Sequence, residues 1–355
     1  MSTIQSPTLT ADEYAEKLFQ SSVAFIDVIA AYLGDRLGWY RALASGPATP
    51  EELVARAGGS ARYAREWLEQ QATSGVLSVD PDGRFRLAEG PAEVLTDEQS
   101  LAYLAPLARM LGAAAAQLPA LVEAYRTGGG VSWAQFGRDM RESQADMNRP
   151  WYEHKLPEVL AGRPEIHAVL GRPNARIADV GCGGGWSSIA IARAYPSSRV
   201  EGYDIDAPSV ELARSNAAGA GLADRVSVHH SGAEALDTEA FDAIFAFECL
   251  HDMADPVGTL RHIRRALKPG GVVVIMDEAV AERFADSRDD IERIMYGFSL
   301  MICLPDGLSH QPSAGTGTVM RPATLRAYAR EAGFADATVL PTGEFGLWRF
   351  YQLIP

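Results

Sequence analysis

The stretch IADVGCGGGWSS, residues 177–188, points most directly to the fold, because an apolar strand ends there in a glycine loop that opens a helix. The fingerprint of a dinucleotide-binding loop is G-x-G-x-x-G. Gly181 and Gly183 fit its first two glycines, but Trp186 stands in place of the third. That third glycine normally lets the helix pack closely on the strand. The indole therefore argues against NAD and leaves open which adenosine-bearing ligand the loop binds.

A carboxylate follows at the end of the next apolar segment, RVEGYD. Asp204 lies about 20 residues after Gly181, where an acidic side chain can accept hydrogen bonds from both ribose hydroxyls. The first basic residue after the loop is Arg193, well inside the helix. Because no cation near the loop can neutralise a pyrophosphate, the sequence predicts an adenosine ligand without phosphates.

Short apolar runs alternate with helical stretches from Arg176 onward. The runs are ARIADV, RVEGYD, RVSVHH, AIFAF and VVVIMDE, and two final strands are expected around ATVLP and LWRFYQL. This alternation predicts a mostly parallel sheet with helices on both faces. The expected fold class is therefore α/β, with a Rossmann-like seven-stranded sheet.

The front of the chain has a different pattern. After a polar arm of about 20 residues, helices are predicted over 21–43, after the capping box that begins at Thr49, and after Ser60. The turn Asp80–Gly83 then joins two short strands. Three helices followed by a hairpin predict a winged helix.

These patterns divide the chain into three parts. We expect an arm and winged-helix domain over residues 1–95, a helical linker over 96–165, and an α/β domain over 166–355. An insert over 281–320 contains the loop LPDGLSHQPSAGTGT, which is rich in Gly, Ser and Pro. Because this loop offers few apolar side chains to hold it in place, the sequence predicts a mobile lid.

Composition restricts the classes of partner. Hydrophobic residues make up 47% and charged residues 22% of the 355, as in globular proteins. With 46 acidic and 32 basic residues, a net charge of −14 argues against nucleic acid as a partner. Three cysteines without paired spacing predict neither a disulfide framework nor a zinc site. No signal peptide is apparent and no apolar run approaches the ~18 residues of a membrane span, so we expect a cytoplasmic protein without a membrane partner.

DVGCGGG followed by GYDID resembles the first two motifs of class I S-adenosylmethionine (SAM) methyltransferases. FDAIFAFECLHDMADP and LRHIRRALKPGGVVVIMDE resemble the fourth- and fifth-strand regions of that family, so the resemblance covers about residues 170–355. With the winged helix in front, the chain resembles the small-molecule methyltransferases of plant phenolic and actinobacterial metabolite pathways. This resemblance implies SAM as the cofactor, a small-molecule acceptor, and a homodimer made by the winged-helix domain, which also helps to enclose the acceptor.

The resemblance also implies which residues bind SAM. Asp179, Gly181 and Gly183 match the motif that holds the amino acid part, Asp204 the ribose ligand, and Ile205 the apolar contact to adenine. Many relatives carry an acidic residue after the third strand, where this chain has Gly232, so adenine recognition falls to backbone atoms or to Glu234. We expect Cys182 to fill space in the loop rather than to act as a nucleophile. The complete expected set is Asp179, Gly181, Cys182, Gly183, Asp204, Ile205, Gly232, Ala233 and Phe247.

The run His251-Asp252-Met253-Ala254-Asp255 matches the H-D-W-x-D motif of the O-methyltransferase relatives, with Met in place of Trp. Their histidine is the general base, and an imidazole with a pKa near 6.5 suits that role, which typically contributes about 10²–10⁴-fold in rate. Two alternatives remain open. His251 either packs beside SAM without catalytic function, or joins Glu278 and His310 in a transition-metal site. Because their spacing is not a local metal motif, we expect no metal.

The sequence thus predicts methyl transfer from SAM to a small, largely apolar metabolite, most directly at a hydroxyl. Nitrogen and carbon acceptors remain open, and the acceptor itself is not identified. Candidates for the acceptor pocket are Trp151, Met295, Phe298 and Met301.

The alternative from another class is a regulator that senses SAM and binds DNA through the winged helix. Its recognition helix would carry Arg62 and Arg65 beside Glu66 and Glu69. Mixed charge of this kind is a weak electrostatic footprint for DNA.

Overall fold

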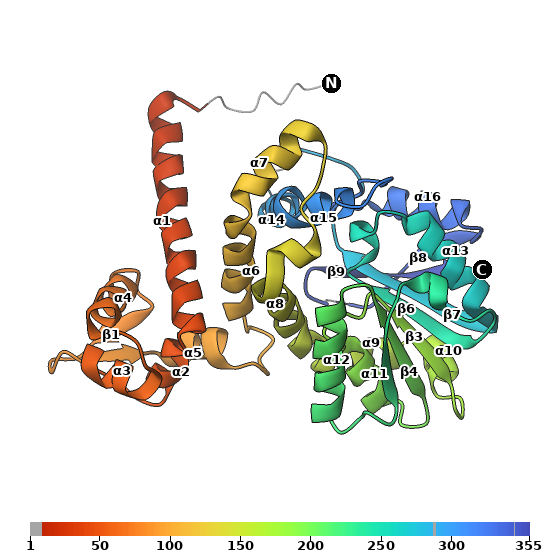
Figure 1. Ribbon diagram of the computed structural model, residues 1–355, viewed down its shortest axis with the longest axis horizontal. Coiled ribbons are helices and arrows are strands. Elements are labelled where there is room, and N and C mark those ends of the chain that lie inside the picture. The colour runs from red at the N-terminus through yellow and green to blue at the C-terminus, as the bar shows by residue number, and fades with distance from the viewer. Residues whose placement is uncertain (1–8, 287–288, 344) are drawn as a thin grey trace. The chain divides into compact units, whose positions relative to one another are not determined.

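The computed structural model of this chain describes residues 9–286, 289–343 and 345–355 (Figure 1). The chain forms two compact units, Met1–Gly112 and Ala113–Pro355, each with its own core. The boundary between them falls inside the linker predicted over 96–165. Residues 1–8 of the predicted arm and residues 287–288 of the predicted insert lie outside the described residues.

The first unit is built from helices and one small hairpin. Its core contains Trp39, Tyr40 and Trp67, and each of the first two rings meets Trp67 edge-on, with centroids 5.1 and 5.0 Å apart. Four helices, α1 to α4, precede the hairpin, where three were predicted. The elements are α1 (Ala11–Arg36), α2 (Trp39–Ala44), α3 (Pro50–Ala57), α4 (Ala61–Thr73), β1 (Leu77–Val79), β2 (Phe85–Leu87), α5 (Glu89–Thr96) and α6 (Ala105–Ala116), the last of which crosses the unit boundary.

The predicted polar arm is wrong over most of its length, because α1 already begins at Ala11. Thr10 and Glu13 form a reciprocal capping box there, the sequence signal that the arm prediction overlooked. The single helix predicted over 21–43 is also wrong, because two helices, α1 and α2, occupy this range. Gly38 separates α1 from α2 with a left-handed φ of 69°, a conformation that favours glycine.

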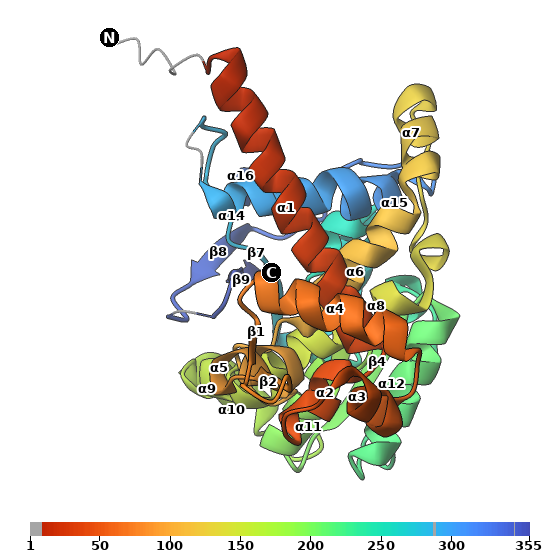
Figure 2. The same ribbon diagram turned by 90° about the vertical axis from the view of Figure 1, so that its left-hand side faces the viewer.

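α1 is a single long helix (Figure 2). Its apolar side chains are mostly exposed. It is long and apolar enough to meet the criterion for a membrane span, as do α6 and α7 (Leu118–Thr127) together despite a 59° bend. Because α1 also contains polar and charged side chains such as Asp27, it is not an uninterrupted apolar run of ~18 residues, and one or two such helices are weak evidence for a membrane span. The exposed large side chains of α1 are Tyr14, Leu18, Phe19, Val23, Phe25, Ile26 and Leu33.

The second unit contains the predicted seven-stranded sheet. Its strand order is β5-β4-β3-β6-β7-β9-β8, with β9 antiparallel to both of its neighbours and the other pairs parallel. The chain moves outward from β3 through β4 to β5, and then returns to place β6 on the other side of β3. The strands are β3 (Arg176–Val180), β4 (Arg199–Asp204), β5 (Val226–His230), β6 (Phe241–Phe247), β7 (Leu267–Glu278), β8 (Asp336–Leu340) and β9 (Trp348–Ile354).

Helices cover both faces of the sheet (Figure 1). One core lies under α9 (Leu156–Ala161), α10 (Pro164–Leu170), α11 (Trp186–Ala194) and α12 (Ala207–Gly219). The other lies under α13 (Pro256–Ala266) and α16 (Pro322–Glu331). Adjacent strand residues such as Ile177 and Ala178 belong to opposite cores, as the pleat requires. The predicted fold class is confirmed.

The insert is more firmly packed than its composition suggests. It contains α14 (Asp290–Phe298), a π-helical turn η3 (Ser299–Cys303) and α15 (Leu304–Leu308), so the predicted loop begins as a helix. The backbone N–H groups of Gly317 and Ala314 donate to the carbonyls of His251 and Ala254, at 3.1 and 2.8 Å. Thr318 and Met320 are buried. Backbone hydrogen bonds and buried side chains thus hold this segment, although its loop offers few apolar side chains.

The insert also packs on the segment before α8 (Trp133–His154). Val131 N donates to Pro305 O at 3.0 Å, and Trp133 N donates to the Asp306 carboxylate at 2.6 Å. Gly130 lies so close to the backbone of Pro305 and Ser309 that a Cβ would overlap both. Because these contacts come from backbone atoms, hydropathy and composition do not reveal them.

Candidate active site

The candidate site lies at the carboxyl ends of β3 and β6, where the strand order reverses. Ligands of open α/β sheets bind at such switch points. Gly181 follows β3 and Cys249 follows β6, and the two touch. A Cβ built on Gly181 would lie 2.7 Å from Cys249 Cβ and Sγ, and its φ of +70° also favours glycine. The glycine loop and the segment that carries His251 are therefore parts of one site.

Asp179, at the end of β3, holds the residues that follow the glycine loop. Its Oδ2 accepts hydrogen bonds from the hydroxyls of Ser187 and Ser188, both at 2.6 Å, at the start of α11. The side chain is buried, and burial raises its pKa to about 6 although the two serines act to lower it. With Oδ2 shared by two hydroxyls, Asp179 positions the loop that surrounds a ligand.

Asp204 ends β4 and holds the tip of the same loop. Its Oδ2 accepts from Gly183 N at 2.8 Å and its Oδ1 from Asp206 N at 2.9 Å. Burial raises its pKa, and the two backbone donors oppose that shift. The next residue, Ile205, is apolar and yet 67% exposed. A carboxylate that accepts hydrogen bonds, next to an exposed apolar side chain, fits the ribose and the flat base of an adenosine.

The other residues predicted to contact SAM differ in whether their side chains can reach a ligand. Cys182, Ala233 and Phe247 are buried in the two cores, so only their backbone atoms are available to a ligand. Cys182 Sγ packs under Gly202, where a Cβ would come within 2.8 Å of it. The Glu234 carboxylate turns back to accept from Gly232 N at 3.0 Å.

Trp186 does not loosen the packing at the start of α11. Gly185, one position earlier, makes the close approach, since a Cβ there would lie 3.0 Å from Ala213 Cβ of α12. The Trp186 ring is half-buried under the guanidinium of Arg149, 4.1 Å from the ring centroid. This close approach is made to the neighbouring helix α12, whereas the third fingerprint glycine normally serves packing on a strand.

His251 lies in η2 (Leu250–Asp252) and is only 2% exposed. Its Nδ1 is 3.0 Å from Asp277 Oδ1 and 3.2 Å from Glu278 Oε2, both at the end of β7. Its Nε2 is 3.2 Å from Asp252 Oδ1. Both nitrogens of the ring therefore face carboxylates, an arrangement that stabilises the charged form.

These carboxylates determine the charge of the ring. Burial alone would lower the pKa of His251, but Asp252, Asp277 and Glu278 outweigh it and raise the pKa well above 6.5. Burial in turn raises the pKa of Glu278, although His251 opposes that shift. Without a ligand, these carboxylates favour the imidazolium form of His251, which must lose that proton before it can accept another.

Glu248 is a site residue that the sequence reasoning missed. It follows β6 directly, with a left-handed φ of 50° that is uncommon outside glycine. Its carboxylate accepts from Asn148 Nδ2 of α8 and Trp348 Nε1 of β9, and burial raises its pKa to about 7. The one signal in the sequence was an acidic residue in an otherwise apolar strand end.

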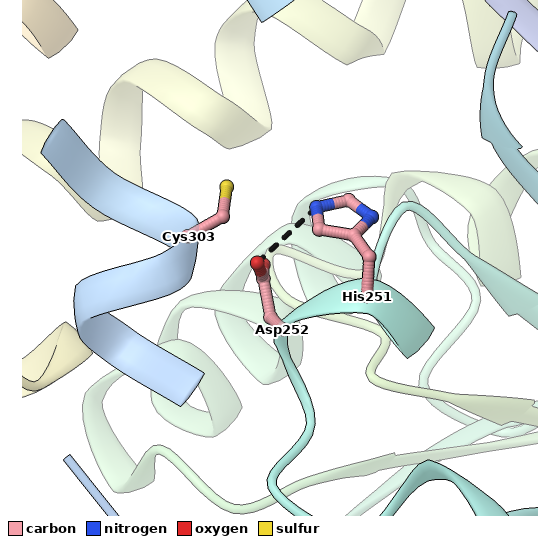
Figure 3. Close-up of side chains that lie close together, drawn as sticks. All are labelled: His251, Asp252 and Cys303. Carbon is pink, nitrogen blue, oxygen red and sulfur yellow. Dashed lines mark ion pairs between the residues drawn. The ribbon is translucent and has the colours of Figure 1, made fainter. Parts of the chain in front are cut away.

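The metal set considered from the sequence does not assemble. His310 is exposed and belongs to neither of the metal-capable groups found among the described residues. His251 instead gathers with Asp277 and Glu278 on one side, and with Asp252 and Cys303 on the other (Figure 3).

The pocket candidates from the sequence also separate. Met295 is buried, Phe298 and Met301 are half-buried, and Trp151 packs on Phe345 and Trp348.

Residues 172–312 match a family model described as a methyltransferase domain. The chain carries a methyltransferase domain. This domain holds the glycine loop, Asp204 and His251, so the match covers the site built above. The resemblance inferred from the sequence motifs is confirmed at this level.

Individual relatives extend the likeness. The chain is 32% identical over 166 residues to 27-O-demethylrifamycin SV methyltransferase of Amycolatopsis mediterranei, covering 45% of this chain and 59% of that protein. It spans about half the length of the curated relatives it matches. Among solved structures, mitomycin 7-O-methyltransferase MmcR has a TM-score of 0.72 at 23% identity, covering 97% of both chains. Human N-acetylserotonin methyltransferase, in complex with SAM, has a TM-score of 0.69 at 18% identity, covering 100% and 99%. These structures share the fold with this chain.

Proposed function

We propose that this protein transfers the methyl group of SAM to a hydroxyl of a small, largely apolar metabolite, with His251 as the general base. The observation that carries the proposal is the contact between Gly181 and Cys249, which joins the donor loop to the segment of His251. The methyl carbon forms a bond to the acceptor oxygen as its bond to sulfur breaks. The hydroxyl proton moves to His251 Nε2, and S-adenosylhomocysteine remains.

SAM fits the residues on the donor side. The loop Gly181–Gly185 carries no basic side chain, which suits an adenosine without phosphates. Asp204 and Ile205 offer a carboxylate and an exposed apolar face for the ribose and adenine. A fold relative, the human enzyme named above, was solved with SAM. When bound, SAM supplies the activated methyl group, and the chain aligns the acceptor with it.

His251 acts on the acceptor side through its two nitrogens. In the neutral ring, Nδ1–H donates a hydrogen bond to Asp277 Oδ1. The lone pair of Nε2 is then available to accept the proton of the hydroxyl. As Nε2 takes up the proton, the charge that forms on the ring is stabilised by Asp277 and Glu278, at 3.0 and 3.2 Å. Binding of SAM places a sulfonium in the same region and favours the neutral ring, from which the base reaction starts.

The apolar side chains of α1 support a homodimer, in which a second copy covers them. Phe19 and Ile26 lie seven residues apart, on one face of the helix, and are 61% and 56% exposed. Exposed patches of this kind on a helix mark contact surfaces.

The alternative, a DNA-binding regulator, has less support. Arg62 pairs with Glu66, and Arg65 with Glu51 at 3.6 Å. Arg84 of the hairpin turn pairs with Glu52 at 2.9 Å. These arginines are already neutralised within the unit, whereas a phosphate backbone requires an unbalanced basic face.

The test is SAM consumption by purified protein against a panel of hydroxylated and aminated metabolites, with S-adenosylhomocysteine as the readout. We expect turnover with a hydroxylated acceptor. His251→Ala should keep its affinity for SAM and lose about 10²–10⁴-fold in kcat near neutral pH. Alkaline pH should partly restore it, as the acceptor ionises by itself. If the variant turns over within a few-fold of wild type, His251 is not the base. Methylation only of amines or carbon acids would replace the hydroxyl assignment.

A further inference from the structure

We propose that His251 Nε2, Asp252 and Cys303 Sγ form a binding site for a thiophilic divalent cation of the Zn²⁺ type, and that this cation inhibits methyl transfer. The three donor atoms lie within 4.8 Å of one another, and the two side chains of η2 face Cys303 of η3 (Figure 3). The inhibitory part of this inference rests on the proposed function, while cation binding can be measured without it.

The donor set is chemically coherent. Imidazole nitrogen, carboxylate oxygen and thiolate sulfur are the three protein ligands of zinc, and borderline-soft cations favour sites that include sulfur. His251 Nε2 and Asp252 Oδ1 are already 3.2 Å apart. Asp252 Oδ1 is buried, and the His251 ring is its charged neighbour. A cation bound there would replace the ring proton as the positive charge beside this oxygen.

On the opposite side of the His251 ring, Nδ1 has the carboxylate partner that a metal-binding histidine usually has. Metal-binding histidines usually donate their second ring N–H to a carboxylate, which fixes the tautomer and increases the basicity of the ligand nitrogen. Asp277 Oδ1 lies 3.0 Å from His251 Nδ1, and Asp277 is itself fixed by accepting from Glu278 N at 3.1 Å. His251 therefore presents Nε2, in one orientation, to the side where Cys303 lies.

Local backbone structure places Cys303 at the site. It ends η3, one π-helical turn between α14 and α15, and such turns are frequent at functional sites. η3 is held against the catalytic segment, since Gly317 packs on Ser299 and its N–H donates to His251 O. Burial raises the pKa of Cys303, so without a cation the side chain is a neutral thiol. This excludes a nucleophilic role in the free protein, whereas a bound cation would displace the thiol proton.

Cation binding and base catalysis require the same lone pair. Nε2 cannot accept the hydroxyl proton while it is coordinated, so occupancy of the site blocks the step assigned to His251. None of the three cation ligands belongs to the residues expected to bind SAM, so SAM can still bind on its own side. We therefore expect the cation to reduce kcat while the affinity for SAM changes little.

Co²⁺ is the direct probe of this site. Metal-free protein titrated with Co²⁺ should develop the near-ultraviolet charge-transfer band of a thiolate–cobalt bond, and Zn²⁺ should abolish that band by displacement. Cys303→Ser should lose the band and weaken Zn²⁺ binding by at least about tenfold. Cys249→Ser is the matched control and should keep the band, because Cys249 belongs to neither metal-capable group. Thermal unfolding of both variants checks that the fold survives.

Activity forms the second arm of the test. Zn²⁺ should inhibit the metal-free wild type. In Cys303→Ser the half-inhibitory Zn²⁺ concentration, measured against that variant's own metal-free activity, should rise at least about tenfold. Absence of a thiolate band in the wild type, or its survival in Cys303→Ser, would overturn the site. Inactivation by chelator with recovery on adding metal would overturn the inhibitory role. A protein that shows the band but methylates no acceptor would instead refute the proposed function and leave the cation site standing.

Discussion

His251 Nδ1 and Asp277 Oδ1 lie 3.0 Å apart although 26 residues separate them in the chain. The sheet register causes this. β6 and β7 are parallel neighbours, and Phe247 pairs with Met276, so the residues just after each pair emerge at the same edge. The carboxylate therefore lies at the end of β7, and the imidazole lies in the 3-10 turn η2, which follows the buried strand β6.

This pairing leads to a prediction about pH. Because nearby carboxylates raise the pKa of His251 well above 6.5, the neutral ring becomes more abundant as pH rises, and kcat should still be increasing at pH values above about 6.5. Asp277→Asn removes one of these charges, so the rising limb should move to lower pH while the plateau falls. A pH–rate profile of both proteins, saturated with SAM and acceptor, measures this. A limb that stays in place would mean that Asp277 does not control the protonation of His251.

Binding of SAM should depend on Asp204. Its carboxylate is placed for the ribose and also holds Gly183 N, so Asp204→Ala removes the ligand contact and the support of the loop. Loss of two charge-assisted hydrogen bonds, at about 1.5–3 kcal/mol each, predicts a decrease in affinity of at least about a hundredfold. Calorimetric titration with SAM is the measurement. Glu201→Ala, on the same strand, is the control that should bind normally, and unchanged affinity in Asp204→Ala would refute the ribose assignment.

The donor side of the site was predictable because its residues are close in sequence. A strand, a glycine loop and a carboxylate at the next strand end are local patterns, and Gly181, Gly183 and Asp204 meet in the structure as expected. The same holds for α3, whose capping box at Thr49 and Glu52 is present. Such features need only short-range geometry, which residue type and spacing determine.

The acceptor side depends on contacts that spacing does not encode. Glu248 is surrounded by Asn148 and Trp348, each 100 residues away. Cys303 reaches His251 only because a π-helical turn presents it. The sequence suggested Glu278 and His310 instead, and only Glu278 lies at the ring. Tertiary packing selected these neighbours, so no periodicity identified them.

The packing of the insert can be tested at one glycine. A Cβ on Gly130 would overlap the backbone of Pro305 and Ser309, which cannot rotate away as a side chain could. Gly130→Ala should therefore destabilise the fold by about 1–3 kcal/mol, as overpacking does. Gly129→Ala is the adjacent control, since its Cβ would meet only Thr127 Oγ1, at 3.4 Å. Urea unfolding compares them, and equal stability would show that the insert is not held at this contact.

Self-association should depend on α1. Replacing Phe19 and Ile26 by Ser removes two exposed apolar side chains from one helix face and should shift the protein from dimer to monomer. Tyr63→Ser is the control, because Tyr63 is 76% exposed on α4 and should leave the assembly unchanged. Sedimentation at micromolar concentration measures the mass. A monomeric wild type, or a double variant that remains dimeric, would contradict the assignment of this surface.

The buried carboxyl groups should make the stability of the fold depend on pH. Burial raises the pKa of Asp179 to about 6 and the pKa values of Glu248 and Asp306 to about 7. The unfolded chain releases these protons near pH 4, so between about pH 4 and 7 the folded state binds more protons than the unfolded state. Each such proton lowers the free energy of unfolding by about 1.4 kcal/mol per pH unit as pH rises.

His251 makes the free energy of unfolding decrease further at pH values above the ordinary pKa of a histidine. Its folded pKa is raised, so its contribution to stability is complete below about pH 6.5 and is lost as pH rises through the folded value. Asp242 and Glu153 act in the opposite sense, but their lowered pKa values confine that effect to about pH 4 and below. The SAM-free protein should therefore be more stable near about pH 5 than near about pH 8, and Glu248→Gln should reduce the slope between them. Denaturant unfolding across this range measures it, and a free energy of unfolding that stays constant or rises with pH would show that these carboxyls ionise normally in the folded protein.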